Sequence, residues 1–468
     1  MALSKFLKSR KKRMISLIND LGKSFSYASV LGVDVKHKII SADKGNESIN
    51  EGRDSQAGFV IKLNDGASVL EYSLDDLGSN IAKISAKIKE ELNITNKLKE
   101  LEIKIGALDN EKLVKSFKRQ SDFNKYSDEE LLNYVIDLKN TILKKDDHII
   151  NASVSIQTQD ISKIFVSKDK ELDQNYTWVN GIIMMVYRGD NGKVVMSRDG
   201  AYSNKLKDVL KALPMLVDKL IDKSKHLTLA KPIVPGEYEV ITDPSITGLI
   251  AHEAFGHGVE MDQFVKDRAL AKKYVNDYVA SPIVNMRDGA NSAFSVASYF
   301  FDDDGILAKD TQIIKNGILV SGICDMTSAA ELKVLPTGNG RRESYKRKAY
   351  TRMTNTFFEP GSDKLKDMIK SVKHGYMLFE TNNGMEDPKN WAIQCVCEYG
   401  IEIVDGKLTD NYVSPVVMSG YVPDLLKSIT AVSNELKIIG SGSCGKGYKE
   451  WVRVSDGGAH LKAKVKLS

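Results

Sequence analysis

Residues 243–262 read Asp-Pro-Ser-Ile-Thr-Gly-Leu-Ile-Ala-His-Glu-Ala-Phe-Gly-His-Gly-Val-Glu-Met-Asp. An aspartate at the N-cap and a proline at the first helical position together are a strong signal for the start of a helix. The run Tyr238–Ile241 just before them has the composition of a strand. The sequence therefore predicts a strand followed by a helix, and this helix carries His252 and Glu253 in its last turn.

The two histidines and the glutamate of this stretch indicate a hydrolytic metal site. Imidazole nitrogens bind the metal in such sites, and a carboxylate beside them acts as the base for the bound water. His252 and His257 are five residues apart, about 140° around an ideal helix, whereas H-E-x-x-H spaces its histidines by four. Both can reach one ion only if the helix ends between them. Gly256 and Gly258 lie where we expect that end.

A catalytic zinc ion usually has three protein ligands, so a third ligand is needed. Glu260 and Asp262 are local candidates, and Cys444 is a distant one in the glycine-rich segment 440–447. Two unrelated histidines and a simple tight turn around Cys444 are the alternatives without a metal. Lys446 beside Cys444 also leaves open a cysteine nucleophile, because a nearby cation lowers the pKa of a thiol.

Two other groups of possible ligands have simpler explanations. Cys395 and Cys397 are two residues apart in a predicted strand and face the same side, as thiols in a core would. Asp302-Asp303-Asp304-Gly305 lacks the rest of a calcium-binding loop, so we expect a turn there.

Composition describes a soluble globular protein of more than one domain. The chain has 468 residues, 42% hydrophobic and 28% charged, and this length predicts two or three domains. The formal net charge of +5 gives little support for a nucleic-acid partner, and no apolar run reaches the length of about 18 residues that indicates a membrane span.

The basic segment 5–13 lacks the apolar stretch of a secretory signal, so a solvated helix is expected. Four cysteines are too few for a disulfide framework, and we expect a cytoplasmic protein with reduced thiols.

The pattern along the chain predicts an α+β fold with two domains. Two prolines and a glycine in residues 231–236 interrupt both the helical and the strand periodicity, so the domain boundary is placed there. Residues 1–230 are expected to form a mixed strand and helix domain, and residues 231–468 a β-rich domain that carries the metal-binding helix. The expected N-terminal elements are strands in 30–75, helices in 79–145, strands in 152–200 and a helix in 206–223. Local signals are hairpin turns at Asn64-Asp65-Gly66, Asp304-Gly305, Asn316-Gly317 and Asp405-Gly406, a capping box at Ser127–Glu130 and a kink at Pro214.

Several blocks of the C-terminal half resemble one family. Residues 248–262 are similar to the signature of the TldD/PmbA family of metalloproteases, and residues 352–356, Arg-Met-Thr-Asn-Thr, followed by Pro360-Gly361, resemble its R-M-T-N-T segment. Residues 443–446 resemble its C-G-K motif, and residues 454–457 the segment after that motif. The order and spacing of the blocks agree over about residues 230–468, and the N-terminal half matches more loosely. The family commonly has a glutamine shortly after C-G-K, whereas residues 447–450 here read Gly-Tyr-Lys-Glu.

The resemblance implies a zinc-dependent peptidase of the catalytic TldD branch, because the chain keeps the whole H-E-x-x-x-H motif. It implies His252, His257 and Cys444 as zinc ligands and Glu253 as the general base. The implied substrates are peptides and unfolded segments, reached through a cleft that two subunits form. The partner subunit would be a second copy, giving a homodimer, or a motif-lacking homologue, giving a heterodimer. No nucleic-acid or membrane partner is expected.

Arg352 and Asn355 are our candidates for contacts with the substrate or a second subunit, and a structural ion pair in the core is the alternative. Two other functions stay open. A non-catalytic binding or regulatory protein would hold a structural zinc through four protein ligands, with Glu260 or Asp262 as the fourth. A cysteine hydrolase would use Cys444 with a histidine.

Overall fold

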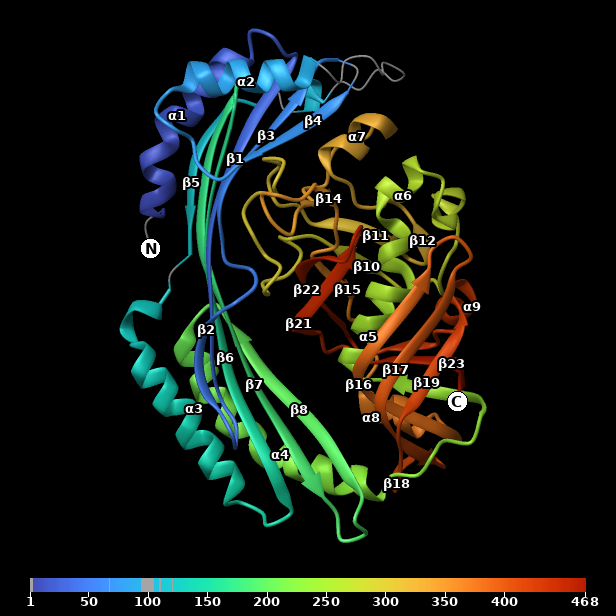
Figure 1. Cartoon of the computed structure of the whole chain (residues 1–468). Coiled ribbons are helices and arrows are strands. Elements are labelled where there is room, and N and C mark those ends of the chain that lie inside the picture. Colours follow the sequence, from blue (N-terminus) through green and yellow to red (C-terminus); the bar gives the residue numbers. More distant parts are fainter. Residues whose placement is uncertain (1–2, 67, 94–104, 109–110, 120) are drawn as a thin grey trace.

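The N-terminal half is built around one long, curved sheet (Figure 1). The computed structural model describes residues 3–66, 68–93, 105–108, 111–119 and 121–468. The strands follow the order β4-β3-β1-β6-β7-β5, with β2 paired to β1 and β8 paired to β7. Among the described strands of this sheet, only β5 and β7 pair in parallel. The strands are β1 (Tyr27–Ala42), β2 (Glu47–Glu51), β3 (Gln56–Asn64), β4 (Val69–Leu74), β5 (Leu113–Lys118), β6 (Ile149–Ser167), β7 (Lys170–Arg188) and β8 (Val194–Ser203).

The turns of this sheet follow the predicted signals. Gly66 lies between β3 and β4 with a φ of +98°, a conformation that residues with a side chain rarely adopt. Gly192, with a φ of +78°, closes the turn between β7 and β8. The strands expected in 30–75 and 152–200 are thereby confirmed.

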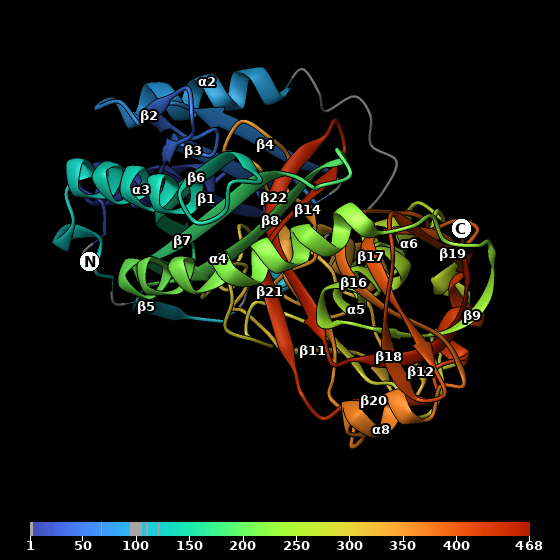
Figure 2. The same cartoon turned by 90° about the horizontal axis from the view of Figure 1, so that it is seen from below.

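Helices cover both ends of the sheet (Figures 1 and 2). α3 begins with the predicted capping box, in which the Ser127 Oγ accepts the Glu130 N–H at 3.1 Å and the Glu130 carboxylate accepts the Ser127 N–H at 2.7 Å. Of the helix expected near 79–101, residues 81–93 are helical and 94–101 lie outside the described residues. The helix expected over 206–223 continues to Leu229 and contains Pro214. The helices are α1 (Lys5–Leu21), α2 (Ile81–Asn93), α3 (Asp128–Leu143) and α4 (Leu206–Leu229), with short 3-10 turns η1 (Gly106–Leu108) and η2 (Phe123–Lys125).

The C-terminal half contains two larger sheets and one strand pair, which confirms the predicted β-rich character. The first sheet has the order β16-β9-β23-β19-β17-β18 with β20 on β23, and the second has the order β12-β11-β10-β15-β22-β21. The strands are β9 (Gly236–Thr242), β10 (Met286–Asp288), β11 (Thr311–Lys315), β12 (Ile318–Leu319), β13 (Gly340–Arg341), β14 (Tyr350–Thr351), β15 (Asn355–Phe358), β16 (His374–Asp387), β17 (Ala392–Val404), β18 (Lys407–Val413), β19 (Val416–Tyr421), β20 (Ala431–Val432), β21 (Lys437–Lys446), β22 (Glu450–Gly458) and β23 (Leu461–Leu467).

A helical segment lies between these two sheets and joins their cores. It consists of α5 and η3, which contact β16 of the first sheet and β22 of the second. Its apolar side chains belong to one large buried cluster with residues of both sheets. The helical elements are α5 (Pro244–Leu249), η3 (Ile250–Gly256), η4 (His257–Val259), α6 (Met261–Val265), η5 (Leu270–Tyr274), α7 (Met326–Leu332), α8 (Leu365–Lys370) and α9 (Val422–Lys427).

Three hairpin turns were predicted in this half. Asn316-Gly317 joins β11 to β12 and Asp405-Gly406 joins β17 to β18, in each case with both residues at positive φ. The turn at Asp304-Gly305 also forms, but an isolated bridge between Phe301 and Leu307 replaces the predicted strands.

Buried ion pairs connect the two halves. Lys62 of β3 pairs with Asp304, and Lys163 of β6 pairs with Asp303. Arg342 binds Glu71 of β4 at 3.0 Å. The chain crosses between the halves after α4 and before β9, where the domain boundary was predicted. Independent folding of the two halves stays a prediction. In the described part of the chain, no helix has the length and apolar character needed to cross a membrane.

Candidate metal centre

The helix that carries the histidines begins where the sequence predicts. The Asp243 carboxylate accepts the N–H of Ile246 at 2.8 Å, and Pro244 is the first residue of α5. α5 is short, and from Ile250 the chain continues as η3, a π-helical turn, and then as the 3-10 turn η4. The N–H of His257 donates to the carbonyl of His252, five residues earlier.

The prediction that the helix ends at Gly256 holds for the π-helical turn η3, but the backbone stays helical into the 3-10 turn η4, which begins at His257. A π-helical turn closes its hydrogen bonds between residues i and i+5, so it is wider than an α-helical turn. His252 and His257 therefore lie on the same side of this helical segment, and their rings meet edge to face with centroids 5.1 Å apart. The five-residue spacing is thus accommodated by a wider turn and not by a break.

The two glycines provide space and do not end the helix. Gly256 has φ −59° and ψ −49°, an ordinary helical conformation. A Cβ atom there would lie 2.2 Å from the sulfur of Met353, and one at Gly258 would lie 2.9 Å from the carboxylate of Glu386. Both glycines are needed because other segments pack directly against the backbone.

Cys444 on β21 completes a cluster of three possible ligands. Its Sγ is 3.5 Å from Nε2 of His257, and the ligand atoms of His252, His257 and Cys444 all lie within 4.8 Å of one another. Burial opposes ionisation of the thiol, but the adjacent His257 and His252 hold the pKa of Cys444 well below its usual value. Burial likewise opposes protonation of His252, yet Cys444 raises its pKa to about 9.

Glu260 and Asp262 support the cluster without joining it. Oε2 of Glu260 is 3.1 Å from Nδ1 of His257, and Lys446 donates to Glu260 at 3.0 Å and to Asp262 at 2.7 Å. The local alternatives for the third ligand are therefore already engaged in other contacts. Lys446 points to these carboxylates, so the histidines, and not this lysine, stabilise the Cys444 thiolate.

The three residues fit a metal ion by their chemistry. A thiolate and two imidazoles are typical zinc ligands, and three protein ligands leave a position open. Nδ1 of His252 is buried without a hydrogen-bond partner. Glu260 fixes the orientation of the His257 ring through Nδ1, as carboxylates do behind metal-binding histidines.

Glu253 lies beside this cluster on its accessible side. Its Oε2 is 3.9 Å from Nε2 of His257, and the Glu253 and His257 side chains are 19% and 21% exposed. His252 and Cys444 are each only 4% exposed. Solvent therefore reaches the cluster from the side on which the Glu253 carboxylate lies.

Comparison with known proteins finds relatives that are named metalloproteases. The PmbA/TldA metallopeptidase C-terminal domain matches residues 235–461. A protein named Metalloprotease from Methanothermobacter thermautotrophicus is 24% identical over 452 residues, which is 96% of each chain. A Zinc metalloprotease TldD homolog from Saccharolobus solfataricus is 28% identical over 353 residues, 73% of this chain and 76% of that one. Residues 235–461 thus match the TldD/PmbA family.

A solved structure shows that the likeness extends to the complete fold. TldE from Thermococcus kodakarensis superposes with a TM-score of 0.73, covering 97% of this chain and 99% of that chain, at 16% sequence identity. The N-terminal sheet is therefore part of the shared fold, although its sequence resembled the family only loosely.

Two further carboxylates lie near the cluster. Both carboxylate oxygens of Glu386, on β16, are buried without a partner, and burial holds its pKa well above the usual range. Burial raises the pKa of Asp456, on β22, to about 6. Asp456 lies in the block 454–457, which the resemblance singled out. No sequence signal pointed to Glu386, because it lies more than 120 residues beyond the histidines, in an ordinary strand.

Arg352 and Asn355 lie inside the protein, with no exposed surface. Arg352 donates to the carbonyl oxygens of Cys444 and Glu450. Asn355 donates to the carbonyl of Gly289 at 3.0 Å. The geometry gives no support to the predicted contact with a substrate or second subunit. Arg352 instead fixes the backbone of the β21–β22 hairpin at Cys444, through carbonyl groups and not through the ion pair considered as the alternative.

Proposed function

We propose that this protein is a zinc-dependent metallopeptidase. One observation carries the proposal: His252, His257 and Cys444 converge from two distant segments, with Glu253 at the accessible side of the cluster. Three protein ligands and an open side are typical of catalytic zinc sites, whereas structural sites are closed by four. Because Glu260 and Asp262 are held by Lys446, neither is a free fourth ligand.

The proposed reaction assigns one chemical task to each residue. Zinc supplies Lewis-acid polarisation of the scissile carbonyl and a water with a pKa near neutrality. Glu253 takes a proton from the attacking water and delivers it to the leaving amine. Glu260 holds His257 in one orientation, and Lys446 holds Glu260 in turn.

We infer that the substrates are peptides or unfolded segments and that two subunits enclose them. The match to the family supports both points, and the second subunit is either a copy of this chain or a homologue without the H-E-x-x-x-H motif. A cytoplasmic location is proposed as well, since the four cysteines are free thiols.

Replacement of Glu253 by glutamine tests the mechanism. The Glu253→Gln protein is expected to keep its zinc, measured by elemental analysis, because Glu253 is not a ligand. Its rate of cleavage of an unstructured peptide should fall by about 100-fold to 10,000-fold, the usual contribution of a general base. The matched control Glu129→Gln, on the exposed first turn of α3, should cleave normally. Cleavage by Glu253→Gln at the wild-type rate would rule out the mechanism.

Two further measurements separate the alternatives. A chelator should abolish cleavage and zinc should restore it, which a cysteine hydrolase using Cys444 would not require. A wild-type protein that binds zinc but cleaves no peptide, alone or with a homologous subunit, would instead favour a regulatory protein with a structural zinc.

A further inference from the structure

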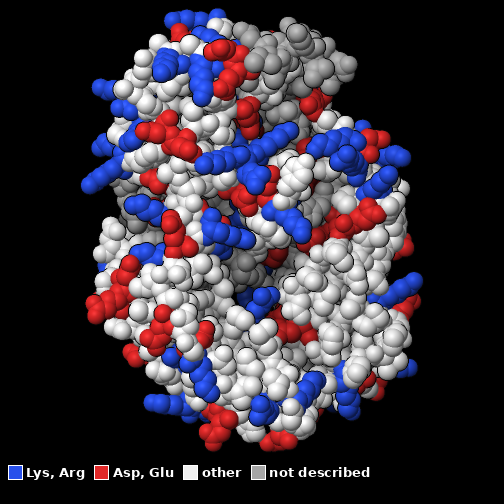
Figure 3. Space-filling model, in the orientation of Figure 1, with Lys and Arg blue, Asp and Glu red and all other residues white. Residues whose placement is uncertain are grey.

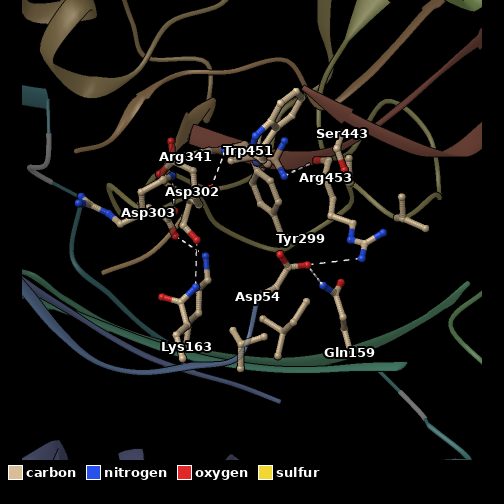
Figure 4. Close-up of a pocket in the computed structure, with 18 of the residues that line it drawn as sticks. Asp54, Gln159, Lys163, Tyr299, Asp302, Asp303, Arg341, Ser443, Trp451 and Arg453 are labelled. Atoms are coloured by element: carbon tan, nitrogen blue, oxygen red, sulfur yellow. Dashed lines mark hydrogen bonds and ion pairs between the residues drawn. The ribbon is translucent and has the colours of Figure 1, made fainter. Parts of the chain in front are cut away.

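A cavity lies between the N-terminal sheet and the β21–β22 hairpin. Its volume is about 110 Å³. The molecule is hollowed between its two halves on the face shown in Figure 3, where basic and acidic side chains border the hollow. In Figure 4, Gln159 and Lys163 reach the cavity from β6, and Ser443, Trp451 and Arg453 reach it from the hairpin. Neither the metal centre nor the proposed reaction uses these residues.

Three arginines of the lining lack full compensation by carboxylates. Arg341 donates to the carbonyls of Met353 at 2.7 Å and of Arg453 at 2.6 Å, and no carboxylate pairs with it among the described residues. Arg53 and Arg453 share Asp54, each at 3.4 Å. Nε of Arg453 is buried without a hydrogen-bond partner. Burial lowers the pKa of Arg453, because it removes water from the charged guanidinium. A bound anion would offset this loss of solvation.

The acidic side chains of the lining are already engaged. Asp303 pairs with Lys163, and the carboxylate of Glu343 accepts the N–H of Trp451 at 2.9 Å. Asp302 accepts three backbone N–H groups, from residues 304, 306 and 340. Asp54 also accepts a hydrogen bond from Gln159. The charge in the cavity that is left without an opposite partner is therefore positive.

The cavity and the metal centre share one strand. Ser443 pairs across the hairpin with Arg453, and Cys444 pairs with Val452. Successive residues of a strand point to opposite faces. Ser443 faces the cavity, and the next residue, Cys444, faces His257. The two sites therefore meet at adjacent residues of β21, on opposite faces of the strand. Among the described residues, β21 is also the last strand of its sheet.

We propose that this cavity, which we name the arginine cavity, binds a carboxylate of the peptide substrate. The carboxylate is an aspartate or glutamate side chain or the free C-terminus. Guanidinium groups bind carboxylates through paired N–H donors. Trp451 and Val296 add apolar surface for the methylene groups of the bound residue. The inference rests on the proposed peptidase function and specifies which substrates that site selects.

The test measures binding, so that it does not depend on turnover. Short labelled peptides are titrated against the zinc-loaded, full-length Glu253→Gln protein. One pair differs by glutamate against glutamine, and a second pair by a free against an amidated C-terminus. The carboxylate member of at least one pair should bind about tenfold more tightly or better. The pair that shows the difference identifies the source of the carboxylate.

Arginine variants test whether the preference for the carboxylate peptide arises from the cavity. Arg453→Gln should remove it, and so should Arg53→Gln, whose side chain is 60% exposed and whose replacement does not disturb the core. Arg188→Gln, exposed at the end of β7, is the matched control and should keep the preference. Equal binding of all peptides, or a preference that survives in both cavity variants, would overturn the proposal.

The outcomes also separate this inference from the proposed function. Wild-type cleavage without a carboxylate preference in binding would overturn the arginine cavity alone. An arginine-dependent preference in a wild-type protein that cleaves nothing would overturn the peptidase function alone. If no peptide binds and the wild-type protein, alone or with a homologous subunit, cleaves none, both proposals fail.

Discussion

At the scale of single residues, Glu260 links His257, a proposed ligand, to Lys446 of the C-G-K motif. Its carboxylate contacts Nδ1 of His257 and also accepts from Lys446. His257 and Lys446 hold the pKa of Glu260 below its usual range although burial would raise it. Glu260 is therefore a carboxylate at neutral pH and keeps the proton of His257 on Nδ1, which leaves Nε2 free for a metal.

Replacement of Glu260 by glutamine should weaken metal binding without removing a ligand. Loss of such a supporting carboxylate typically lowers metal affinity about 10-fold to 100-fold. Competition with a chromophoric chelator measures this affinity. Asp262→Asn is the matched control, because Asp262 contacts Lys446 but not His257. Equal losses in the two variants would show that the charge near Lys446 matters and the contact with His257 does not.

The residues of the site differ in how well the sequence predicted them. His252, Glu253 and His257 are adjacent in the chain, and their chemistry is evident from the motif. Cys444 came from the resemblance, because spacing alone left Glu260 and Asp262 equally open. The sequence could not predict Glu386, because β16 meets Gly258 only in the folded chain. The burial of its carboxylate also results from tertiary packing.

At the scale of elements, the π-helical turn η3 explains the spacing of the motif. The sequence predicted the start of the helix correctly, since the signals at Asp243 and Pro244 are local. It did not predict the wider turn, because the interactions that favour it are tertiary. Met353 lies against Gly256, and η3 is enclosed by β15, β16, β17 and β22. Periodicity assumes 3.6 residues per turn and therefore placed the two histidines on different faces.

The N-cap of α5 should give the protein a distinct dependence on pH. Burial raises the pKa of Asp243 from 3.8 to about 6. The folded state thus binds this proton more tightly than the unfolded state, so the contribution of Asp243 to stability is full below about pH 4 and is lost as the pH rises through about 6. Relative to Asp243→Asn, which keeps a capping oxygen, the wild-type free energy of unfolding should fall by at most about 3 kcal/mol over that interval.

Urea unfolding at a series of pH values measures this difference. Both proteins are compared at the same zinc concentration, so that the contribution of the metal cancels. A difference between wild type and Asp243→Asn that stays constant from pH 4 to pH 7 would contradict the buried, protonated Asp243.

At the scale of the whole molecule, the proposed substrate selection requires contacts between the two halves. The metal centre lies within the C-terminal half, but the arginine cavity needs β6 and the turn before β3 from the N-terminal half. The sequence predicted the α+β class and the β-rich second half from turn signals. It predicted only a turn at Asp302-Asp303-Asp304-Gly305, because local composition does not show that Lys62 and Lys163 come from the N-terminal sheet to pair with its aspartates.

The pair between Lys62 and Asp304 is the most enclosed of these contacts, with side chains 7% and 0% exposed. Lys62→Met leaves the Asp304 carboxylate buried without its partner, and the free energy of unfolding in urea should fall by about 3–5 kcal/mol. Adding Asp304→Asn removes the unpaired charge and should recover much of this loss. Lys38→Met, which breaks an exposed pair with Asp128, is the control and should cost about 1 kcal/mol or less. If Lys62→Met costs no more than Lys38→Met, this ion pair does not hold the two halves together, and the arginine cavity must be maintained by other contacts, such as the apolar packing of Phe301 against the N-terminal sheet.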